Sequence, residues 1–355
     1  MPPLLRELLL ARGPSGRESV PVAIWREAAA PFAQVSTDLI GTPLALVAPR
    51  GGSRRSGQPR RLLVMGHIDE IGLIVTHIDD DGFLWFSEVG GWDPQILIGQ
   101  RIVLDTRAGP VKGVIGKKPI HLLRKEEREK VPAIRDMHID IAARDGEDAR
   151  AMVRVGDVAV IDADPVELPN GRLASRALDN RLGSYVALEA ARLVAEAGGA
   201  AWEIAAVAAA QEETTFGGSR TSAFALQPDA AIVVDVTHAT DAPGIDVKHA
   251  GKHELGSGAV IARGSTLHDG VFERLHDAGE AEKIPFTVEA SGRNTGTDAD
   301  AVHLSRGGVP TGLVSIPLRY MHSPVELVQL DDVDAAARLI AAFALRLQKG
   351  ASFAR

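Results

Sequence analysis

Short apolar runs that end at polar or breaking residues recur along this chain. Continuous apolar runs of this length are typical of strands buried on both faces of a mostly parallel sheet. The runs that carry this prediction are Arg61–Met65, Trp202–Ala210, Ala230–Val234 and Thr311–Ile316.

Two longer segments have the periodicity of amphipathic helices. Residues 180–197 form the clearer pattern, and residues 331–348 form a second one near the end of the chain. Strands that alternate with helices indicate an α/β fold in which helices sandwich the sheet. We therefore predict a mixed, mostly parallel sheet sandwiched by helices.

The stretch 72–163 has a different pattern. It consists of short alternating runs separated by turn sequences such as Asp79–Gly82 and Gly90–Pro94. This pattern predicts a small β-rich, barrel-like domain inserted into the α/β domain. The expected division is 1–71 with 164–355 for the catalytic domain and 72–163 for the insertion. The glycine-rich segment 51–57 is expected to be a surface turn.

Composition narrows the classes of function. The 355 residues carry a formal net charge of −8, and no basic stripe suggests nucleic acid as a partner. The absence of cysteine excludes disulfides, thiolate zinc sites and cysteine nucleophiles. No apolar stretch is long enough for a membrane span or for the core of a signal peptide, which favours a cytoplasmic protein without membrane contact.

Potential metal ligands stand where the apolar runs end. In open α/β sheets, sites form beyond the carboxyl ends of the strands, so these residues should meet at one edge. They are His67, Glu213, Asp235 and His322, with Asp179 placed just before the longer helix. Imidazole and carboxylate ligands without thiolate favour catalytic zinc, cobalt or manganese. Five ligands complete two metal shells only if one carboxylate and a water are shared between the ions.

Neighbouring acids suggest how such a site would work. His67 and Asp69 are two residues apart, so in extended backbone they share a face, and Asp69 could accept the second ring N–H of His67. Glu212 and Glu213 are adjacent and would point to opposite sides of an extended segment. One of them would bind metal and the other would exchange a proton with the metal-bound water.

At these residues the sequence resembles the M42 family of metallo-aminopeptidases, which includes the TET peptidases. The resemblance covers nearly the whole chain. Its motifs are GHIDEIG (66–72), LDNRLG (178–183), QEETTFGG (211–218), VVDVTHA (233–239), GTDADAVHLSRGGVPTG (296–312) and RYMHSPVE (319–326). Each motif is short, but together they are highly specific.

The resemblance implies a role for each ligand. Asp179 would bridge two divalent ions, zinc being the first choice and cobalt or manganese the alternatives. Glu213 and His322 would complete one shell, and His67 and Asp235 the other. The resemblance also implies that Glu212 is the general base and acid, and that Asp69 is the partner of His67.

The resemblance further implies an enzyme that hydrolyses the N-terminal residue from short peptides. It implies that the inserted domain mediates dimerisation and that dimers assemble into a dodecamer. Several points stay open: the preferred N-terminal residue, the native metal, the choice between dimer and dodecamer, and the physiological substrate.

Three other functions are alternatives. A metal-dependent deacylase or carboxypeptidase of the same clan would share the metals but have a different pocket. A glycan hydrolase would use two carboxylates and aromatic platforms, and only 4% of the residues are aromatic. A non-catalytic scaffold conflicts with the complete set of ligands.

Overall fold

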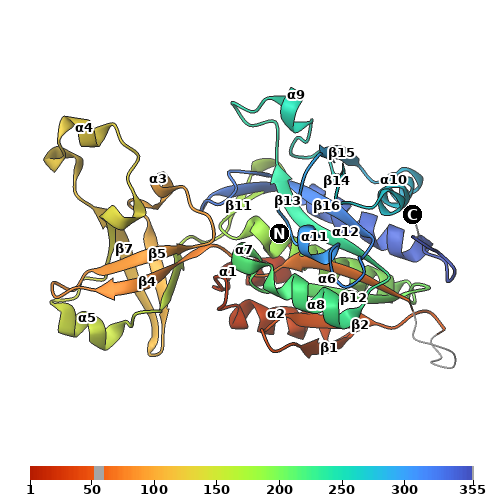
Figure 1. Ribbon diagram of the computed structural model, residues 1–355, viewed down its shortest axis with the longest axis horizontal. Coiled ribbons are helices and arrows are strands. Elements are labelled where there is room, and N and C mark those ends of the chain that lie inside the picture. The colour runs from red at the N-terminus through yellow and green to blue at the C-terminus, as the bar shows by residue number, and fades with distance from the viewer. Residues whose placement is uncertain (52–59, 354–355) are drawn as a thin grey trace.

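The computed structural model describes residues 1–51 and 60–353. The expected glycine-rich turn at 51–57 lies outside these ranges except for its first residue. Figure 1 shows two bodies side by side, a large one that contains both chain termini and a smaller one built from β-strands.

The large body is organised around one twisted sheet with eleven described strands. They are β1 (Gln34–Thr37), β2 (Pro43–Val47), β3 (Arg61–His67), β10 (Val166–Leu168), β11 (Arg172–Ser175), β12 (Glu203–Ala209), β13 (Ala230–His238), β14 (Ala259–Gly264), β15 (Phe286–Ser291), β16 (Thr311–Arg319) and β17 (Glu326–Gln329). The order along the sheet is β1-β2-β12-β3-β13-β16-β17-β11-β10, with β14 joined to β16 and β15 to β14.

The four central strands, β12, β3, β13 and β16, run parallel to one another. They are the four apolar runs that the sequence pattern predicts as buried strands. The flanking strands β2, β14 and β17 pair with them antiparallel. All carboxyl ends of the central strands therefore lie at one edge.

Helices cover both faces of this sheet, as predicted. One face carries α1 (Pro3–Leu10), α2 (Ser19–Ala29), α6 (Leu178–Glu196), α10 (Asp269–Glu282) and α12 (Leu330–Arg346), and the other carries α8 (Gly217–Leu226) and α11 (Ala299–Val302). The predicted helices at 180–197 and 331–348 correspond to α6 and α12.

Strand β3 shows why its apolar run is continuous. Leu62 and Val64 are buried against the helices of one face, whereas Leu63 and Met65 are buried against those of the other. Successive side chains of a strand point to opposite faces, so a strand covered on both sides needs apolar residues at every position.

The smaller body is a closed antiparallel barrel in the order β4-β5-β8-β7-β6-β9. Its strands are β4 (Gly72–Ile78), β5 (Leu84–Val89), β6 (Arg101–Thr106), β7 (Gly109–Lys117), β8 (Met137–Asp140) and β9 (Val158–Ile161). It has its own apolar core, which includes Leu84, Ile102 and Ile139. The predicted fold class, an α/β sandwich with an inserted barrel, is confirmed.

The remaining helices are short. They are α3 (Pro94–Leu97), α4 (Lys125–Arg128), α5 (Gly146–Met152), α7 (Glu212–Thr215) and α9 (Val247–Ala250), with single 3-10 turns at Ile120–Leu122, Ile134–Asp136 and Pro169–Gly171. No helix in the described ranges combines the length and the apolar character needed to cross a membrane.

Candidate metal centre

The seven site residues expected from the sequence come together at the carboxyl edge of the central strands. They are His67, Asp69, Asp179, Glu212, Glu213, Asp235 and His322. His67 is the last residue of β3, and Asp179 lies in the first turn of α6. His322 follows the end of β16, in a loop that leads to β17.

Asp179 lies between the two histidines. Its Oδ1 is 3.1 Å from Nε2 of His67, and its Oδ2 is 3.3 Å from Nε2 of His322. Each carboxylate oxygen thus faces a different imidazole. This is the placement that a carboxylate shared between two cations would need.

Three groups of side chains could each hold a metal ion, since their ligand atoms lie within 4.8 Å of one another. The groups are His67–Asp179–Asp235, Asp179–Glu213–His322 and His67–Glu212–Glu213. The first two share Asp179 and match the two shells expected from the sequence. All donors are nitrogen or oxygen atoms, a set that suits zinc, cobalt or manganese.

The local structure of Glu212 and Glu213 differs from the extended segment assumed above. Gln211 has a left-handed backbone, and the two glutamates open the one-turn helix α7. Their backbone N–H groups both donate to the Asp69 carboxylate, at 3.0 and 3.1 Å. The unpaired N–H groups of a helix start need acceptors, and Asp69 supplies one. The two side chains still have different neighbours: Glu212 is 3.6 Å from His67, and Glu213 is 3.5 Å from His322.

Asp69 therefore does more than the sequence indicates. Nδ1 of His67 lies 3.3 Å from the backbone carbonyl oxygen of Asp69 and 3.4 Å from its Oδ1. The fully buried Asp69 carboxylate thus contacts the ring of one ligand and fixes the backbone of the two glutamates. That the Asp69 carboxylate orients His67 stays a prediction, because the backbone carbonyl group of Asp69 lies close to the same ring nitrogen.

Asp235 does not end its strand. The apolar run stops there, but β13 continues to His238 because its pairing with β16 continues to Leu318. Asp235 is thus a buried carboxyl group in the interior of a strand. A fixed strand position holds such a ligand more rigidly than a loop would.

The cluster places several carboxyl groups close together in a buried position, which disfavours their ionised forms. Burial raises the pKa of Glu212 to about 10; His67 opposes this shift, and Asp235 adds to it. Burial likewise raises the pKa of Asp235 well above its ordinary value. For His322, burial lowers the pKa, but hydrogen bonds to Asp179 and Glu213 outweigh it and raise the pKa to about 11. Bound cations would relieve this repulsion, since an opposite charge favours the ionised carboxylate. The donor set therefore fits two divalent ions.

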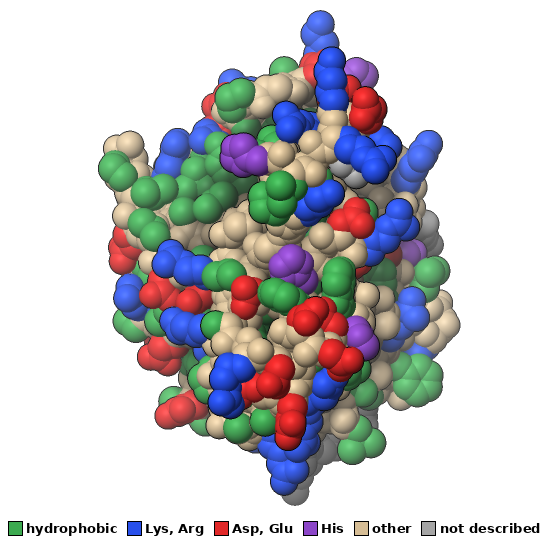
Figure 2. Space-filling view, turned by 90° about the vertical axis from the view of Figure 1, so that its left-hand side faces the viewer, with side chains coloured by type: hydrophobic (Ala, Val, Ile, Leu, Met, Phe, Trp, Pro, Cys, Tyr) green, Lys and Arg blue, Asp and Glu red, His purple; other side chains and the backbone are tan. Residues whose placement is uncertain are grey.

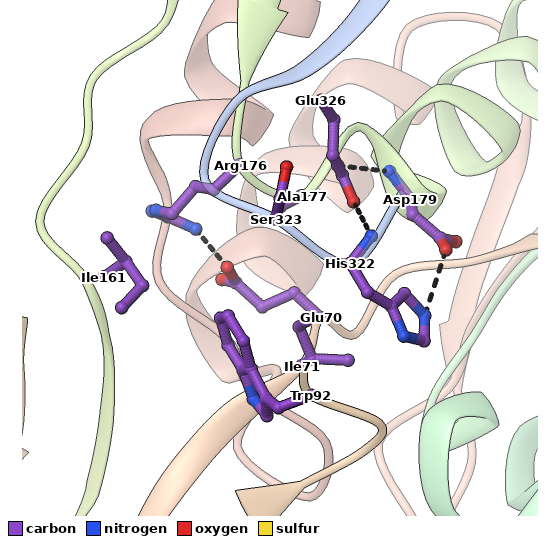
Figure 3. Close-up of a pocket in the computed structure, with 10 residues that line it drawn as sticks. All are labelled: Glu70, Ile71, Trp92, Ile161, Arg176, Ala177, Asp179, His322, Ser323 and Glu326. Atoms are coloured by element: carbon purple, nitrogen blue, oxygen red, sulfur yellow. Dashed lines mark hydrogen bonds and ion pairs between the residues drawn. The ribbon is translucent and has the colours of Figure 1, made fainter. Parts of the chain in front are cut away.

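One functional residue was not assigned a role from the sequence. Figure 3 shows Glu326 between two of the expected ligands. Its carboxylate accepts the backbone N–H of Asp179 at 3.1 Å and that of His322 at 2.9 Å. It thereby ties the start of α6 to the loop after β16. Its sequence signal is its place at the end of the motif RYMHSPVE, four residues after His322.

A second buried acid, Glu70, stabilises the chain segments next to the site. Glu70 pairs with Arg176 (Figure 3), lies 3.3 Å from Arg181, and accepts the backbone N–H of Gly13. Both arginines flank Asp179 in the sequence. This network fixes the segment that carries the shared carboxylate.

The barrel also contributes to the site. Gly90 and Gly91 follow β5 and face the ligands: a Cβ at Gly90 would lie 3.1 Å from Oε2 of Glu213, and one at Gly91 would lie 3.3 Å from Nδ1 of His322. Gly90 also has a φ of +75°, which favours glycine. A side chain here would press on the candidate metal ligands.

The site opens into a cavity of about 470 Å³. Its lining combines the ligands with apolar residues such as Phe216 and Met321, and with the segment Thr295–Thr297. The volume suits part of a peptide.

Several other polar residues lie in or near the cavity. His238 and Thr297 line the cavity, and Asp298 is buried close behind it. Arg319 donates two hydrogen bonds to Asp241, at 3.2 and 2.5 Å, so its guanidinium group belongs to a structural ion pair.

The comparisons with known proteins agree with fold and site. Residues 46–339 match the M42 glutamyl aminopeptidase family, and the chain belongs to that family. A putative aminopeptidase of Acetivibrio thermocellus is 35% identical over 95% of this chain and 96% of its own length. A lysyl aminopeptidase of Pyrococcus furiosus is 37% identical over 80% of this chain and 81% of its own.

Solved structures give the same result. A TET aminopeptidase from a marine sediment archaeon, a Thaumarchaeota archaeon, superposes with a TM-score of 0.89 at 34% identity, covering 97% of this chain and 96% of the other. The TET1 peptidase of Pyrococcus horikoshii, described as able to assemble into a tetrahedron or a large octahedral shell, gives 0.83 at 29% identity, covering 97% and 99%. A Thermotoga maritima protein labelled endoglucanase gives 0.74 at 30% identity, covering 96% of each chain.

The family and the enzyme class expected from the sequence are therefore confirmed. Members of the family are aminopeptidases, which are hydrolases acting on peptides. They depend on metal ions, and this chain has side-chain groups that could hold them.

Proposed function

We propose that this protein is a dinuclear-metal aminopeptidase that removes the N-terminal residue from short peptides, with Glu212 as general base. The observation that carries the proposal is the arrangement of two three-residue ligand groups that share Asp179, with Glu212 3.6 Å from one of the histidines. Family membership supports peptide hydrolysis.

The proposed ligands follow the two groups. Asp179, His67 and Asp235 would hold one ion, and Asp179, Glu213 and His322 the other. Zinc is the first choice, with cobalt and manganese as alternatives, since nitrogen and oxygen donors accept all three. When bound, the ion pair would make a water acidic near neutral pH and polarise the scissile carbonyl group.

The chain's own residues would move the protons. Glu212 would take a proton from the attacking water and then deliver it to the leaving amine. Its raised pKa in the protein environment would fall beside bound cations, which would place it in the range of a working base. Asp69 would hold the backbone of Glu212 and the ring of His67 during this exchange.

We also propose that the insertion 72–163 mediates dimerisation and that dimers build a dodecamer. The TET1 relative forms large assemblies. The barrel exposes Val114, Ile120, Leu122 and Val131. Figure 2, which looks onto the barrel end, shows hydrophobic side chains gathered at its upper left. Light scattering on a size-exclusion column would test the assembly, and a monodisperse monomer would contradict it. A cytoplasmic location stays a prediction that cell fractionation would test.

The decisive experiment is hydrolysis of aminoacyl-p-nitroanilides by chelator-treated protein, with zinc, cobalt and manganese returned separately. We expect activity to disappear on chelation and to return with metal. Matched N-acetylated substrates should not be cleaved, because an aminopeptidase needs a free amino group.

The alternatives predict other results. Cleavage of blocked substrates would indicate a deacylase or carboxypeptidase. Hydrolysis of glycans alone, by folded and metal-loaded protein, would favour the endoglucanase label carried by one structural relative.

A further inference from the structure

One acid in the wall of the cavity has no part in the proposed chemistry. Glu289 lines the cavity from β15, while the other lining acids, Asp179, Glu212, Glu213 and Asp235, belong to the metal cluster. The side chain of Glu289 is half-buried, and its Oε1 accepts the hydroxyl of Thr237 at 3.2 Å.

The strand pattern aims this carboxylate inward. Thr287, Glu289 and Ser291 are half-buried on β15, whereas Val288 and Ala290 between them are exposed. Alternation along a strand therefore turns Glu289 toward β13 and the cavity.

The position of Glu289 relative to the ligands follows from β13. Thr237 stands two residues beyond Asp235 on that strand, a step of about 7 Å. Glu289 is thus near the proposed centre without touching it. This spacing suits the end of a substrate side chain whose α-carbon lies beside the metal ligands.

No protein cation neutralises Glu289 among the residues that the structure describes. It forms no salt bridge there, and the described lining of the cavity contains neither lysine nor arginine. Burial lowers the pKa of nearby His253, although Glu289 opposes this shift. A half-buried carboxylate whose hydrogen-bond partner is neutral and which has no cationic partner attracts a cationic group.

We propose that Glu289 selects substrates with a basic N-terminal side chain, lysine or arginine, by pairing with its cationic end. The inference rests on the proposed aminopeptidase function and deepens it. Apolar lining residues such as Phe216, Val236 and Met321 suit the methylene stem. An acidic N-terminal residue, the preference in the family's name, would face repulsion from Glu289.

The test compares lysyl, norleucyl and glutamyl p-nitroanilides on the metal-loaded enzyme. Norleucine has a stem like that of lysine without the ammonium group. We expect kcat/KM for the lysyl substrate to exceed that for the norleucyl one by about tenfold or more, the usual scale of a charge-assisted hydrogen bond. Glutamyl should be the poorest.

Substitutions of Glu289 test whether this residue causes the preference for a basic side chain. Glu289→Gln keeps an acceptor for Thr237 and should lower kcat/KM for the lysyl substrate to about the norleucyl level. Glu289→Lys should invert the order in favour of the glutamyl substrate. Glu280→Gln, which makes the same charge change on the exposed surface of α10, should alter none of the ratios.

Two results would overturn the inference. One is a preference of the wild-type enzyme for the norleucyl over the lysyl substrate, a result that does not depend on the folding of any variant. The other is an equal loss on both substrates in Glu289→Gln, which would assign the carboxylate to the substrate's α-amino group. Failure of the proposed function looks different: no free-amine substrate would be cleaved with any metal.

Discussion

The strands of the barrel and those of the central sheet are buried in different ways. In the barrel, antiparallel strands close on themselves, and its side chains such as Leu104 and Ile139 fill an apolar core. In the central sheet, parallel strands are covered by helices on both faces, so their side chains are apolar as far as one edge. At that edge the strand ends, the start of α6 and the short helix α7 bring polar side chains together.

The same difference appears in the acids of the two regions. Asp148, on helix α5 of the smaller body, is half-buried, and its hydrogen bond from Arg144 lowers its pKa to about 2. Glu212 of the sheet edge is buried among other acids, and its pKa rises to about 10. Asp148 thus stays ionised down to low pH beside its Arg144 partner, whereas the carboxyl groups at the sheet edge would all be ionised only beside bound cations. The proposed chemistry belongs to the sheet edge, and the barrel reaches it through Gly90 and Gly91.

The largest expected effect is at the sheet edge. Glu212→Gln should lower kcat by about 10²–10⁴, the usual contribution of a general acid–base residue, with the metal content unchanged. Steady-state kinetics together with elemental analysis measure both, and Glu280→Gln is the control. Substantial residual hydrolysis in metal-loaded Glu212→Gln would remove Glu212 from the mechanism.

The barrel core should affect stability without affecting chemistry. Leu104→Ala, at a fully buried position, should cost about 2–5 kcal/mol of unfolding free energy. Denaturant titration measures this, with Val155→Ala, at an exposed position of the same inserted segment, as the control. Activity per folded, metal-loaded molecule should be retained. If kcat fell in parallel, the separation between the two regions would be wrong.

A substitution at the contact between the barrel and the site should have an intermediate effect on activity. In Gly90→Ala the new Cβ would meet Ile71 at 2.5 Å and Glu213 at 3.1 Å, so we expect kcat/KM to fall about ten- to hundredfold through a misplaced ligand. Gly99→Ala is a matched control, because Gly99 has a similar φ of +81° and no atom within 4 Å of its Cβ position. Equal losses would trace the effect to backbone strain alone.

The smallest effect concerns the barrel surface. Because the pKa of Asp148 is lowered from 3.8 to about 2 by Arg144, its ion pair stabilises the fold above pH 3.8 and is lost as the pH falls toward 2. Asp148→Asn should therefore flatten the dependence of unfolding free energy on pH between 4 and 2. Exposed Asp136→Asn is the control. An unchanged slope in Asp148→Asn would show that solvent screens the pair completely.

The sequence by itself determined the central strands, the two long helices, the inserted barrel and the seven candidate residues. The reason is local: a strand covered on both faces must be apolar at every position, and its carboxyl end is where polar residues can appear. His67 and His322 could be found in this way without coordinates. The segment 72–163 was distinguishable because its alternation has a different period.

Only the tertiary structure decided how those residues are held. Glu212 and Glu213 form a helical turn instead of an extended segment because the Asp69 carboxylate accepts both of their N–H groups. Asp235 lies inside its strand because β16 continues to pair with it.

The roles of three other residues were also not predictable from the pattern of the chain. Glu326 bridges the backbones of two candidate ligands, Gly90 leaves the space beside Glu213 that a Cβ would fill, and Glu289 faces the cavity from an edge strand. Each depends on contacts between segments distant in the sequence or on a backbone conformation that packing selects. Such contacts leave no local signal, because hydrogen bonding and burial across a fold act through space and not along the chain.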